Sequence, residues 1–277
     1  MPHSSAQYIS ASRRNDLPRF FYNEFYSARK KGEITYDGGY GRSYTVSLKQ
    51  EDVSGYIFWS KDFSRFIGHP QFGELIRENN AVFHFTINDM PALEPRIPPL
   101  EKRLETLARL CDLAGPERVL WRYDPLCKYV SESGIATITD TPFYAILKPV
   151  AAAGITRCYF SFMTAYKKLG GRGIDFEEFT LEEKREIAAG MRDAASAEGL
   201  TLYNCCNKEI PSLVPGIRKA HCVDNDLLKS TDRFGVHREL KIKPTRSGCG
   251  CFESRDIGSY AHVCPHGCRY CYANPEI

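Results

Sequence analysis

The sequence predicts an α/β protein: a partial (β/α)6 TIM-like barrel over residues 1–230, followed by an extended linker and a cysteine-rich tail over residues 231–277. Six short apolar runs alternate with helical patterns, which is typical of a parallel sheet with helices outside it. After Leu228 this alternation ends and a polar, basic segment leads into clustered cysteines. A doubly wound open sheet is the alternative, but no glycine-rich dinucleotide fingerprint follows any predicted strand.

The six predicted strands are rich in β-branched and aromatic residues. They are residues 8–12, 55–59, 81–87, 119–123, 157–162 and 200–205. Helical stretches are predicted after the first five strands, at residues 19–31, 63–79, 100–114, 141–153 and 180–197. Pro70 interrupts the second stretch, and Thr180 with Glu183 forms a capping-box start for the last. Residues 37–48 are predicted to form an extended excursion before the second strand.

The composition is that of an ordinary globular protein, with 43% hydrophobic and 26% charged residues. A net charge of +3 is a weak indication of a nucleic-acid partner, which usually leaves a clearer basic footprint. No apolar run approaches the ~20 residues of a membrane helix. The N-terminal residues lack the pattern of a signal peptide. We therefore expect a cytoplasmic protein without a membrane partner.

The strongest functional signal lies near the C-terminus. Cys264, Cys268 and Cys271 have the spacing C-x3-C-x2-C, and Tyr270 precedes the third cysteine. Three thiolates packed this closely can hold three irons of a [4Fe–4S] cluster and leave the fourth iron open. The x3 spacing and the aromatic residue favour such a cluster over zinc.

Eleven cysteines are many for a chain expected in a reducing compartment, where clustered cysteines indicate metal ligands rather than disulfides. Zinc is the alternative at the tail, since Cys249 and Cys251 together with Cys268 and Cys271 offer four thiolates. A second metal centre, such as a second Fe–S cluster, is a further possibility. Its ligands would be Cys206, Cys222, Cys249 and Cys251.

The segment CPHGCRYCYA (residues 264–273) resembles the cluster loop of the radical S-adenosylmethionine (SAM) superfamily, and in particular that of spore photoproduct lyase and DNA-repair-photolyase-like proteins. In that superfamily the open iron chelates the amino and carboxylate groups of SAM, and the aromatic residue packs near the adenine. The resemblance implies cluster ligation by Cys264, Cys268 and Cys271 and a cofactor contact by Tyr270. In most of the superfamily this loop follows the first barrel strand, whereas here it ends the chain.

A wider resemblance runs over nearly the whole length. The motifs SASRRNDLP (residues 10–18), FWSKD (58–62) and WRYDP (121–125), with the terminal cysteine block, look like a bacterial family of about this length whose activity is not established. This resemblance supports the fold and the cofactor, but it implies no substrate.

Polar residues follow the predicted strands at their carboxyl ends, where barrel enzymes carry their active sites. Guanidinium groups suit the carboxylate of SAM because they bind it bidentately, and acidic groups suit its ammonium or ribose hydroxyls. The candidate cofactor-binding residues at the strand ends are Arg13, Arg14, Lys61, Arg122, Asp124, Lys208 and Glu209. The alternative is a salt-bridge network within the barrel, for instance Arg122 with Asp124 or Glu209.

The leading hypothesis is a radical SAM-type enzyme that uses a [4Fe–4S] cluster to cleave SAM reductively and to generate a 5′-deoxyadenosyl radical on an unidentified substrate. Its partners would be a small-molecule substrate and a reductant such as ferredoxin or flavodoxin. Tyr166 with Cys205 or Cys206 could pass a hydrogen atom in a radical relay. The tail could close its own barrel or, in a swapped homodimer, that of a partner.

Two other classes of function stay open. The first is a non-catalytic Fe–S or zinc protein in electron transfer or binding. The second is a nucleic-acid repair lyase-like enzyme, which the weak positive charge supports little.

Overall fold

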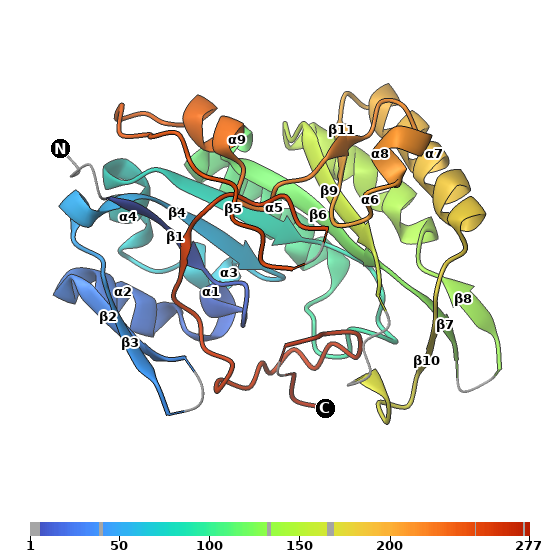
Figure 1. The fold of residues 1–277 in the computed structure, drawn as a ribbon, viewed down its shortest axis with the longest axis horizontal. Helices are drawn as coiled ribbons and strands as arrows, with labels where there is room; N and C mark the ends of the chain where they lie inside the picture. The colour runs from blue at the N-terminus through green and yellow to red at the C-terminus, as the bar shows by residue number, and fades with distance from the viewer. Residues whose placement is uncertain (1–5, 39–40, 132–133, 165–168, 247, 274) are drawn as a thin grey trace.

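The central feature is a parallel sheet of eight strands in the order β12-β11-β9-β6-β5-β4-β1-β13 (Figure 1). A computed structural model describes residues 6–38, 41–131, 134–164, 169–246, 248–273 and 275–277. The sheet strands are β1 Gln7–Ala11, β4 Val53–Ser60, β5 Ala81–Thr86, β6 Val119–Leu126, β9 Arg157–Phe162, β11 Thr201–Asn204, β12 Arg218–Lys219 and β13 Arg255–Asp256. All six predicted strands are present.

The strands from β1 to β11 are neighbours in the order in which they occur along the chain. This order arises when a connecting segment carries the chain from the end of one strand to the start of its next parallel neighbour. A doubly wound sheet reverses its strand order at a switch point, and the pairings of the described strands contain no such reversal. Among those strands no pairing joins β12 to β13, so the sheet is open at these two edges.

Helices follow the predicted pattern closely. Pro70 separates α3 from α4, as predicted. The capping box at the start of α7 is confirmed, because Thr180 Oγ1 accepts from Glu183 N at 3.2 Å and Glu183 Oε2 accepts from Thr180 N at 2.7 Å. The helices are α1 Leu17–Phe20, α2 Tyr22–Lys31, α3 Ser64–Ile67, α4 Phe72–Glu78, α5 Leu100–Ala114, α6 Thr141–Ala152, α7 Leu181–Ala197, α8 Ile210–Leu213 and α9 Asn225–Ser230, with 3-10 turns η1 Gln50–Asp52 and η2 Pro116–Arg118.

Two small antiparallel sheets decorate the connections. The hairpin of β2 Glu33–Asp37 and β3 Ser43–Ser47 occupies the predicted extended excursion, although its first strand begins earlier than expected. Strands β10 Asp175–Glu177, β7 Lys128–Val130 and β8 Ala136–Ile138 form the second sheet. Its strands are too short to give a readable alternation, and the sequence analysis missed them.

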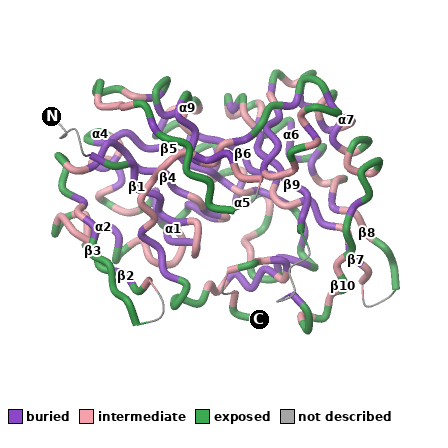
Figure 2. Tube along the Cα trace, viewed as in Figure 1, coloured by how far each residue is buried: buried purple, intermediate pink, exposed green. Residues whose placement is uncertain are grey.

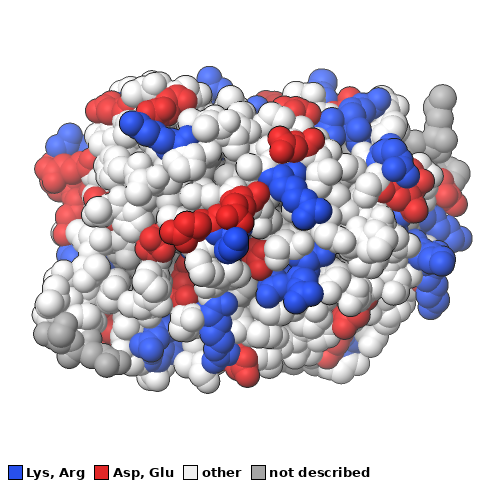
Figure 3. Space-filling view, turned by 180° about the vertical axis from the view of Figure 1, so that it is seen from behind, with Lys and Arg blue, Asp and Glu red and all other residues white. Residues whose placement is uncertain are grey.

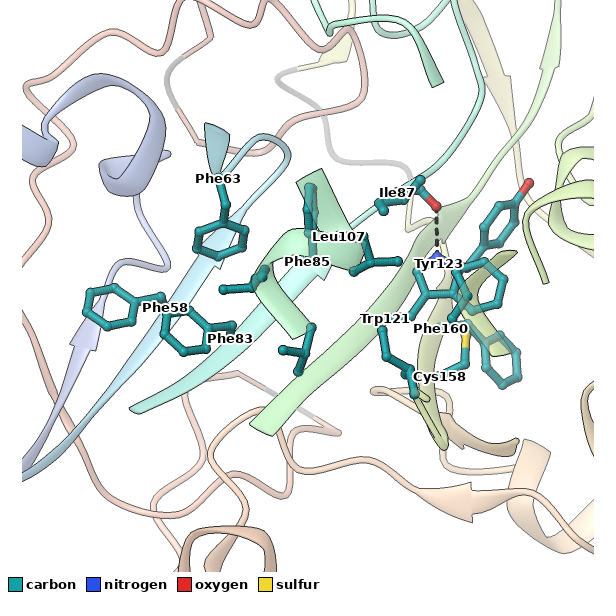
Figure 4. Close-up of a cluster of buried hydrophobic side chains, with 14 of the residues drawn as sticks. Phe58, Phe63, Phe83, Phe85, Ile87, Leu107, Trp121, Tyr123, Cys158 and Phe160 are labelled. Atoms are coloured by element: carbon teal, nitrogen blue, oxygen red, sulfur yellow. Dashed lines mark hydrogen bonds between the residues drawn. The ribbon is translucent and has the colours of Figure 1, made fainter. Parts of the chain in front are cut away.

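Helices α1 to α7 cover one face of the central sheet, which we call the outer face. Phe58 of β4, Phe83 of β5 and Trp121 of β6 all point to this face, and Leu107 of α5 packs onto them (Figure 4). The indole N–H of Trp121 donates to the Ile87 carbonyl at 2.9 Å, so this polar atom is buried with a partner. Each fully buried side chain of this size contributes roughly 1.5–3 kcal/mol.

The opposite, inner face of the sheet carries Tyr8, Ile57, Val82, Leu120 and Tyr159. A late segment of the chain covers it, and the side chains that do so are Val223, Leu227, Leu228, Leu240 and Cys251. Figure 1 shows this orange-to-red segment crossing the sheet after α9 and pairing as β13 beside β1. The predicted linker region therefore supplies both a cover and an edge strand.

The surface seen from behind carries lysine and arginine interspersed with aspartate and glutamate, without a large area of one sign (Figure 3). Within the described residues, none of the helices combines the length and the apolar character needed to cross a bilayer.

Candidate functional site

The tail docks against the carboxyl ends of the strands through residues 264–271, here called the terminal cysteine loop. Within it, Tyr270 donates a hydrogen bond to the buried carboxylate of Glu94. Lys61 Nζ donates to the same Glu94 oxygen at 2.7 Å, and Asn88 Nδ2 does so at 3.0 Å. The Lys61 ammonium also lies 5.4 Å from the centre of the Tyr270 ring. Much of the loop is buried, as the purple stretch near the C-terminus in Figure 2 shows.

A second anchor joins the loop to the ends of β1 and β4. His266 Nε2 lies 2.9 Å from Asp16 Oδ2, and both side chains are buried. Asp16 also accepts from Ser60 Oγ at 2.6 Å and from Lys61 N at 2.9 Å. The carboxylate of Asp16 thus fixes two strand ends and the loop relative to one another.

Burial and ion pairing have opposite effects on the pKa values of Lys61 and Glu94. Burial by itself would lower the pKa of Lys61, but the charge and hydrogen bond of Glu94 outweigh it, so the pKa lies above 10.5. Burial would raise the pKa of Glu94, yet Lys61 and the Tyr270 hydroxyl hold it below 4.5. Both groups are therefore charged at neutral pH, and the loop rests on a buried ion pair.

None of the three cysteines of the loop is in a disulfide. Burial, with Asp16 nearby, raises the pKa of Cys264 to about 11. Burial also raises the pKa of Cys268, although Lys61 opposes this shift. Cys268 interacts electrostatically with both Cys264 and Cys271. A metal must therefore displace protons from Cys264 and Cys268 on binding.

The donor set fits three-iron ligation of a [4Fe–4S] cluster. Each cysteine of such a cluster binds a different iron, so the thiols surround a cluster rather than one point. Three neighbouring cysteines outside any disulfide meet this need, and the Ala273 N–H lies 3.4 Å from Cys271 Sγ as a hydrogen-bond donor. Across the ranges that the structure describes, no three His, Cys, Asp or Glu side chains are arranged around a position for a single metal ion.

A second group of sulfurs lies against the inner face of the sheet. Cys205 Sγ is 3.5 Å from Cys206 Sγ and 3.7 Å from Cys222 Sγ. Cys249 and Cys251, from the covering segment, complete this group. The structure therefore brings together the four cysteines predicted for a second metal centre and adds Cys205. Cys249 and Cys251 lie with this group and not with Cys268 and Cys271, so the four thiolates of the zinc alternative at the tail are not assembled.

Most of the predicted cofactor-binding cations have partners within the chain. Arg13 Nε and Arg14 Nε lie 3.6 Å and 3.7 Å from the carboxylate oxygens of Asp256 in β13. Arg122 Nη2 pairs with Asp124 Oδ2 at 2.5 Å, and Ser161 also donates to Asp124. The salt-bridge alternative is therefore realised at these positions.

The last two predicted residues lie elsewhere. Glu209 Oε1 is 3.5 Å from Lys184 Nζ of α7, in a partly exposed pair, and Lys208 is exposed. No described contact links either residue to the terminal cysteine loop. Tyr166, predicted for a radical relay, lies outside the described residues.

Several buried polar atoms at the strand ends have no protein partner. Among the described residues they include Arg13 Nη1, Asn15 Oδ1, Glu94 Oε2 and His266 Nδ1. Buried polar groups are normally satisfied, so these atoms indicate places for water or for a ligand. Arg13 is the one predicted cofactor-binding residue in this set.

The sequence analysis missed Glu94 and gave His266 no role in docking. Glu94 lies in a loop between Met90 and Ile97, without a periodic pattern around it. The available signal was a single acid between Pro91 and Pro95 in an otherwise apolar stretch. Such a residue is costly to bury unless it is paired, but the partner cannot be read from neighbouring positions.

Two cavities of the described structure are lined by residues other than cysteine. One of about 370 Å³ lies at the opposite, amino end of β4, where Val53, Ser54 and Asn80 contribute to its lining. Another of about 90 Å³ lies beside Glu94 and Arg103. The smaller cavity adjoins the terminal loop's anchor, whereas the larger has no link to the predicted chemistry.

A family model described as a domain of unknown function, DUF1848, matches residues 8–273. The chain belongs to the DUF1848 family. No curated protein matches this DUF1848 chain in sequence.

Solved structures offer distant likenesses to the DUF1848 chain. The SuiB structure from Streptococcus suis, bound to S-adenosylmethionine, is 10% identical with a TM-score of 0.33, over 82% of this chain and 47% of SuiB. Morphinone reductase is 13% identical with a TM-score of 0.33, over 90% and 66% of the two chains. A putative alpha-L-fucosidase from Bacteroides thetaiotaomicron is 10% identical with a TM-score of 0.36, over 84% and 85%. The chain spans about half the length of SuiB, and these likenesses are too distant to indicate a function.

Proposed function

We propose that this DUF1848 protein is a radical SAM-type enzyme whose open sheet is a partial (β/α)6 barrel. Cys264, Cys268 and Cys271 would hold three irons of a [4Fe–4S] cluster at the carboxyl ends of the strands. The observation that carries the proposal is the buried anchoring of the terminal cysteine loop through Tyr270 and Glu94. Buried polar groups cost free energy unless they are paired, so two buried anchors indicate a loop that must be held in place.

A cluster held there would supply, when reduced, one electron for the reductive cleavage of SAM and thereby the means to take hydrogen from a substrate. The chain's own residues orient and enclose this chemistry. Lys61 lies against Cys268 and Glu94, so its positive charge stabilises a thiolate at that position. The ion pair also fixes Tyr270, the predicted cofactor contact.

Arg13 is the cation best placed to bind a SAM carboxylate. Its Nε and Nη2 groups already face Asp256 and Ser254, but its buried Nη1 has no protein acceptor. A guanidinium whose Nε and Nη2 groups are held by protein acceptors can still donate from Nη1 to a ligand oxygen. Arg122 and Asp124 stay candidates for the polar groups of SAM or substrate on the inner face.

The deciding experiment is EPR spectroscopy of the anaerobically reconstituted, dithionite-reduced protein, with and without SAM. We expect a [4Fe–4S]+ signal that changes when SAM is added, together with formation of 5′-deoxyadenosine. Cys268→Ala should abolish both, whereas Cys111→Ala, a buried cysteine of α5 far along the chain from the loop, should retain both.

Other outcomes would assign the protein to another class. A signal that is indifferent to SAM would indicate an electron-transfer or structural cluster. Zinc without any iron would overturn the proposal. Salt-dependent affinity for DNA, together with SAM cleavage, would indicate a nucleic-acid substrate; the face seen in Figure 3 carries charges of both signs and offers no basic patch for one.

A further inference from the structure

The five cysteines against the inner face form a closed ring of sulfur contacts, here called the sulfur ring. Cys205 contacts Cys206 and Cys222 at 3.5 Å and 3.7 Å. Cys206 contacts Cys249, Cys249 contacts Cys251, and Cys251 contacts Cys222 through side-chain interactions. None of the five is in a disulfide. The ring joins residues from the end of β11, from the loop after β12 and from the covering segment.

The ring does not fit an ion bound by all five sulfurs. If all five neighbouring pairs had the separation of the two pairs around Cys205, 3.5 Å and 3.7 Å, the centre of the ring would lie about 3.1 Å from each sulfur, which is longer than the ~2.3 Å of a zinc–thiolate bond. This agrees with the finding that no described group surrounds a position for a single metal ion as it stands. Four thiolates around zinc lie about 3.8 Å apart in a tetrahedron, and the four sulfurs other than Cys205 Sγ are linked in a row by the contacts of Cys206 with Cys249, of Cys249 with Cys251 and of Cys251 with Cys222.

Hydrogen-bond donors distinguish four sulfurs from the fifth. Arg246 Nε lies 3.2 Å from Cys206 Sγ, and Arg122 Nη1 lies 3.4 Å from Cys222 Sγ. The Cys251 N–H faces Cys249 Sγ at 3.4 Å, and the Cys222 N–H faces Cys251 Sγ at 3.1 Å. Thiolate ligands are stabilised by such donors and by nearby positive charge. Within the described residues, Cys205 contacts sulfur atoms but has no N–H donor of this kind.

The backbone around the ring is shaped for close approach. A Cβ atom at Gly248, where φ is +79°, would lie 2.7 Å from the Cys206 carbonyl oxygen. A Cβ atom at Gly250 would lie 2.7 Å from Lys219 and 2.9 Å from His221. The two glycines flank Cys249 and let the covering segment bring Cys249 and Cys251 against the strand ends. Cys206 itself has a positive φ of 67°, a conformation rare for residues other than glycine.

We propose that the sulfur ring is a structural zinc site in which Cys206, Cys222, Cys249 and Cys251 bind one tetrahedral Zn²⁺. Each thiol that is protonated in the free protein releases its proton to solvent on binding, and no change of oxidation state occurs. Cys205 stays outside the coordination sphere as a packing residue. The ion ties the covering segment to the end of the sheet, and through Cys222 it fixes Arg122. This site is separate from the terminal cysteine loop and does not depend on its function.

The test is metal analysis of the full-length protein, purified without oxygen and supplied with zinc alone. We expect about one zinc ion per chain, and a zinc absorption-edge spectrum with four sulfurs at about 2.3 Å. Cys206→Ala and Cys251→Ala should lower zinc content at least tenfold. The neighbouring Cys205→Ala is the matched control and should retain zinc. Cys268→Ala should also retain zinc while losing iron, which separates this proposal from the proposed function.

Three results would overturn the assignment. The first is wild-type protein without zinc, whose ring thiols all react as free thiols. The second is additional iron and sulfide, lost in Cys222→Ala, which would make the site a second Fe–S cluster. The third is loss of zinc in Cys205→Ala with retention in Cys206→Ala. The absorption-edge spectrum of the wild type decides the matter even where a variant fails to fold.

Discussion

At the scale of single residues, Glu94 determines how the terminal cysteine loop sits. Its carboxylate is buried and accepts hydrogen bonds from Lys61, Asn88 and Tyr270. Removing one partner from a buried ion pair leaves an uncompensated charge, which costs more than the pair itself contributes. The loop is therefore sensitive to changes at positions far from its cysteines in the sequence.

Lys61→Met should lower the free energy of unfolding by about 3–5 kcal/mol at neutral pH, because Glu94 would be buried without its cation. The cost should shrink at low pH. The pKa of Glu94 lies below 4.5 in the folded protein, so the stabilisation is complete above 4.5 and is lost as pH falls through the folded pKa. Urea unfolding at several pH values measures this.

Lys102→Met, at an exposed position of α5, is the control and should change stability by less than about 0.5 kcal/mol. On the alkaline side, the pKa of Lys61 lies above 10.5. Its contribution should therefore persist up to that pH and decline above the folded pKa. A Lys61→Met cost that is small at neutral pH and independent of pH would contradict the role of the pair.

At the scale of elements, the two-residue strand β13 attaches the tail to the sheet. Its Asp256 accepts from Ser10 Oγ at 2.7 Å, from Arg13 N at 2.9 Å and from Gly258 N at 3.0 Å. The same carboxylate faces the side chains of Arg13 and Arg14. Side-chain contacts, more than the short ladder itself, hold this edge strand in register.

Asp256→Asn should lower the free energy of unfolding by about 2–4 kcal/mol. The amide lacks the negative charge, and its NH2 group would face the hydrogen-bond donors that now bind the carboxylate. Hydrogen exchange should accelerate in β1 and at Ile257, whose N–H donates to the Ser10 carbonyl at 3.1 Å. Asp175→Asn, an exposed position of β10, is the matched control. Unchanged protection in β1 would show that β13 is held by other contacts.

At the scale of the whole molecule, the sheet depends on residues from both ends of the chain. The inner face is covered by Leu240 and Cys251 as well as by α9, and β13 pairs with β1 as the edge strand on that side of the sheet. Without this segment, Tyr8 and Ile57 would lose part of their cover. Exposed apolar area of this kind destabilises a fold and promotes association.

We therefore expect the fragment 1–230 not to fold cooperatively by itself. It should bind a hydrophobic dye and lose its near-ultraviolet circular dichroism, while the full chain unfolds in one transition. The comparison uses thermal scans of both proteins in parallel, with the full-length protein as the control. A fragment with a sharp transition and native-like near-ultraviolet dichroism would show that residues 231–277 form a separate unit.

Local patterns made the strands, the helices and the terminal cysteine spacing predictable. The six strands and the capping box at Thr180 depend on residues close together in sequence, so their signals survive in the sequence itself. The grouping of Cys206 and Cys222 with Cys249 and Cys251 could also be anticipated, because the first pair follows the last predicted strand. The positions of these four cysteines in the sequence indicated that they form one group, but not how their sulfur atoms are arranged.

By itself, the sequence determined the alternation of strands and helices and the presence of two cysteine groups. The tertiary structure alone decided that Arg13 and Arg14 face Asp256, that Tyr270 rests on Glu94 and that Cys205 completes the sulfur ring. The physical reason is the range of the interactions. Periodicity is set by neighbouring residues, whereas the partner of a buried charge or thiol is whichever group the fold brings near, however distant along the chain.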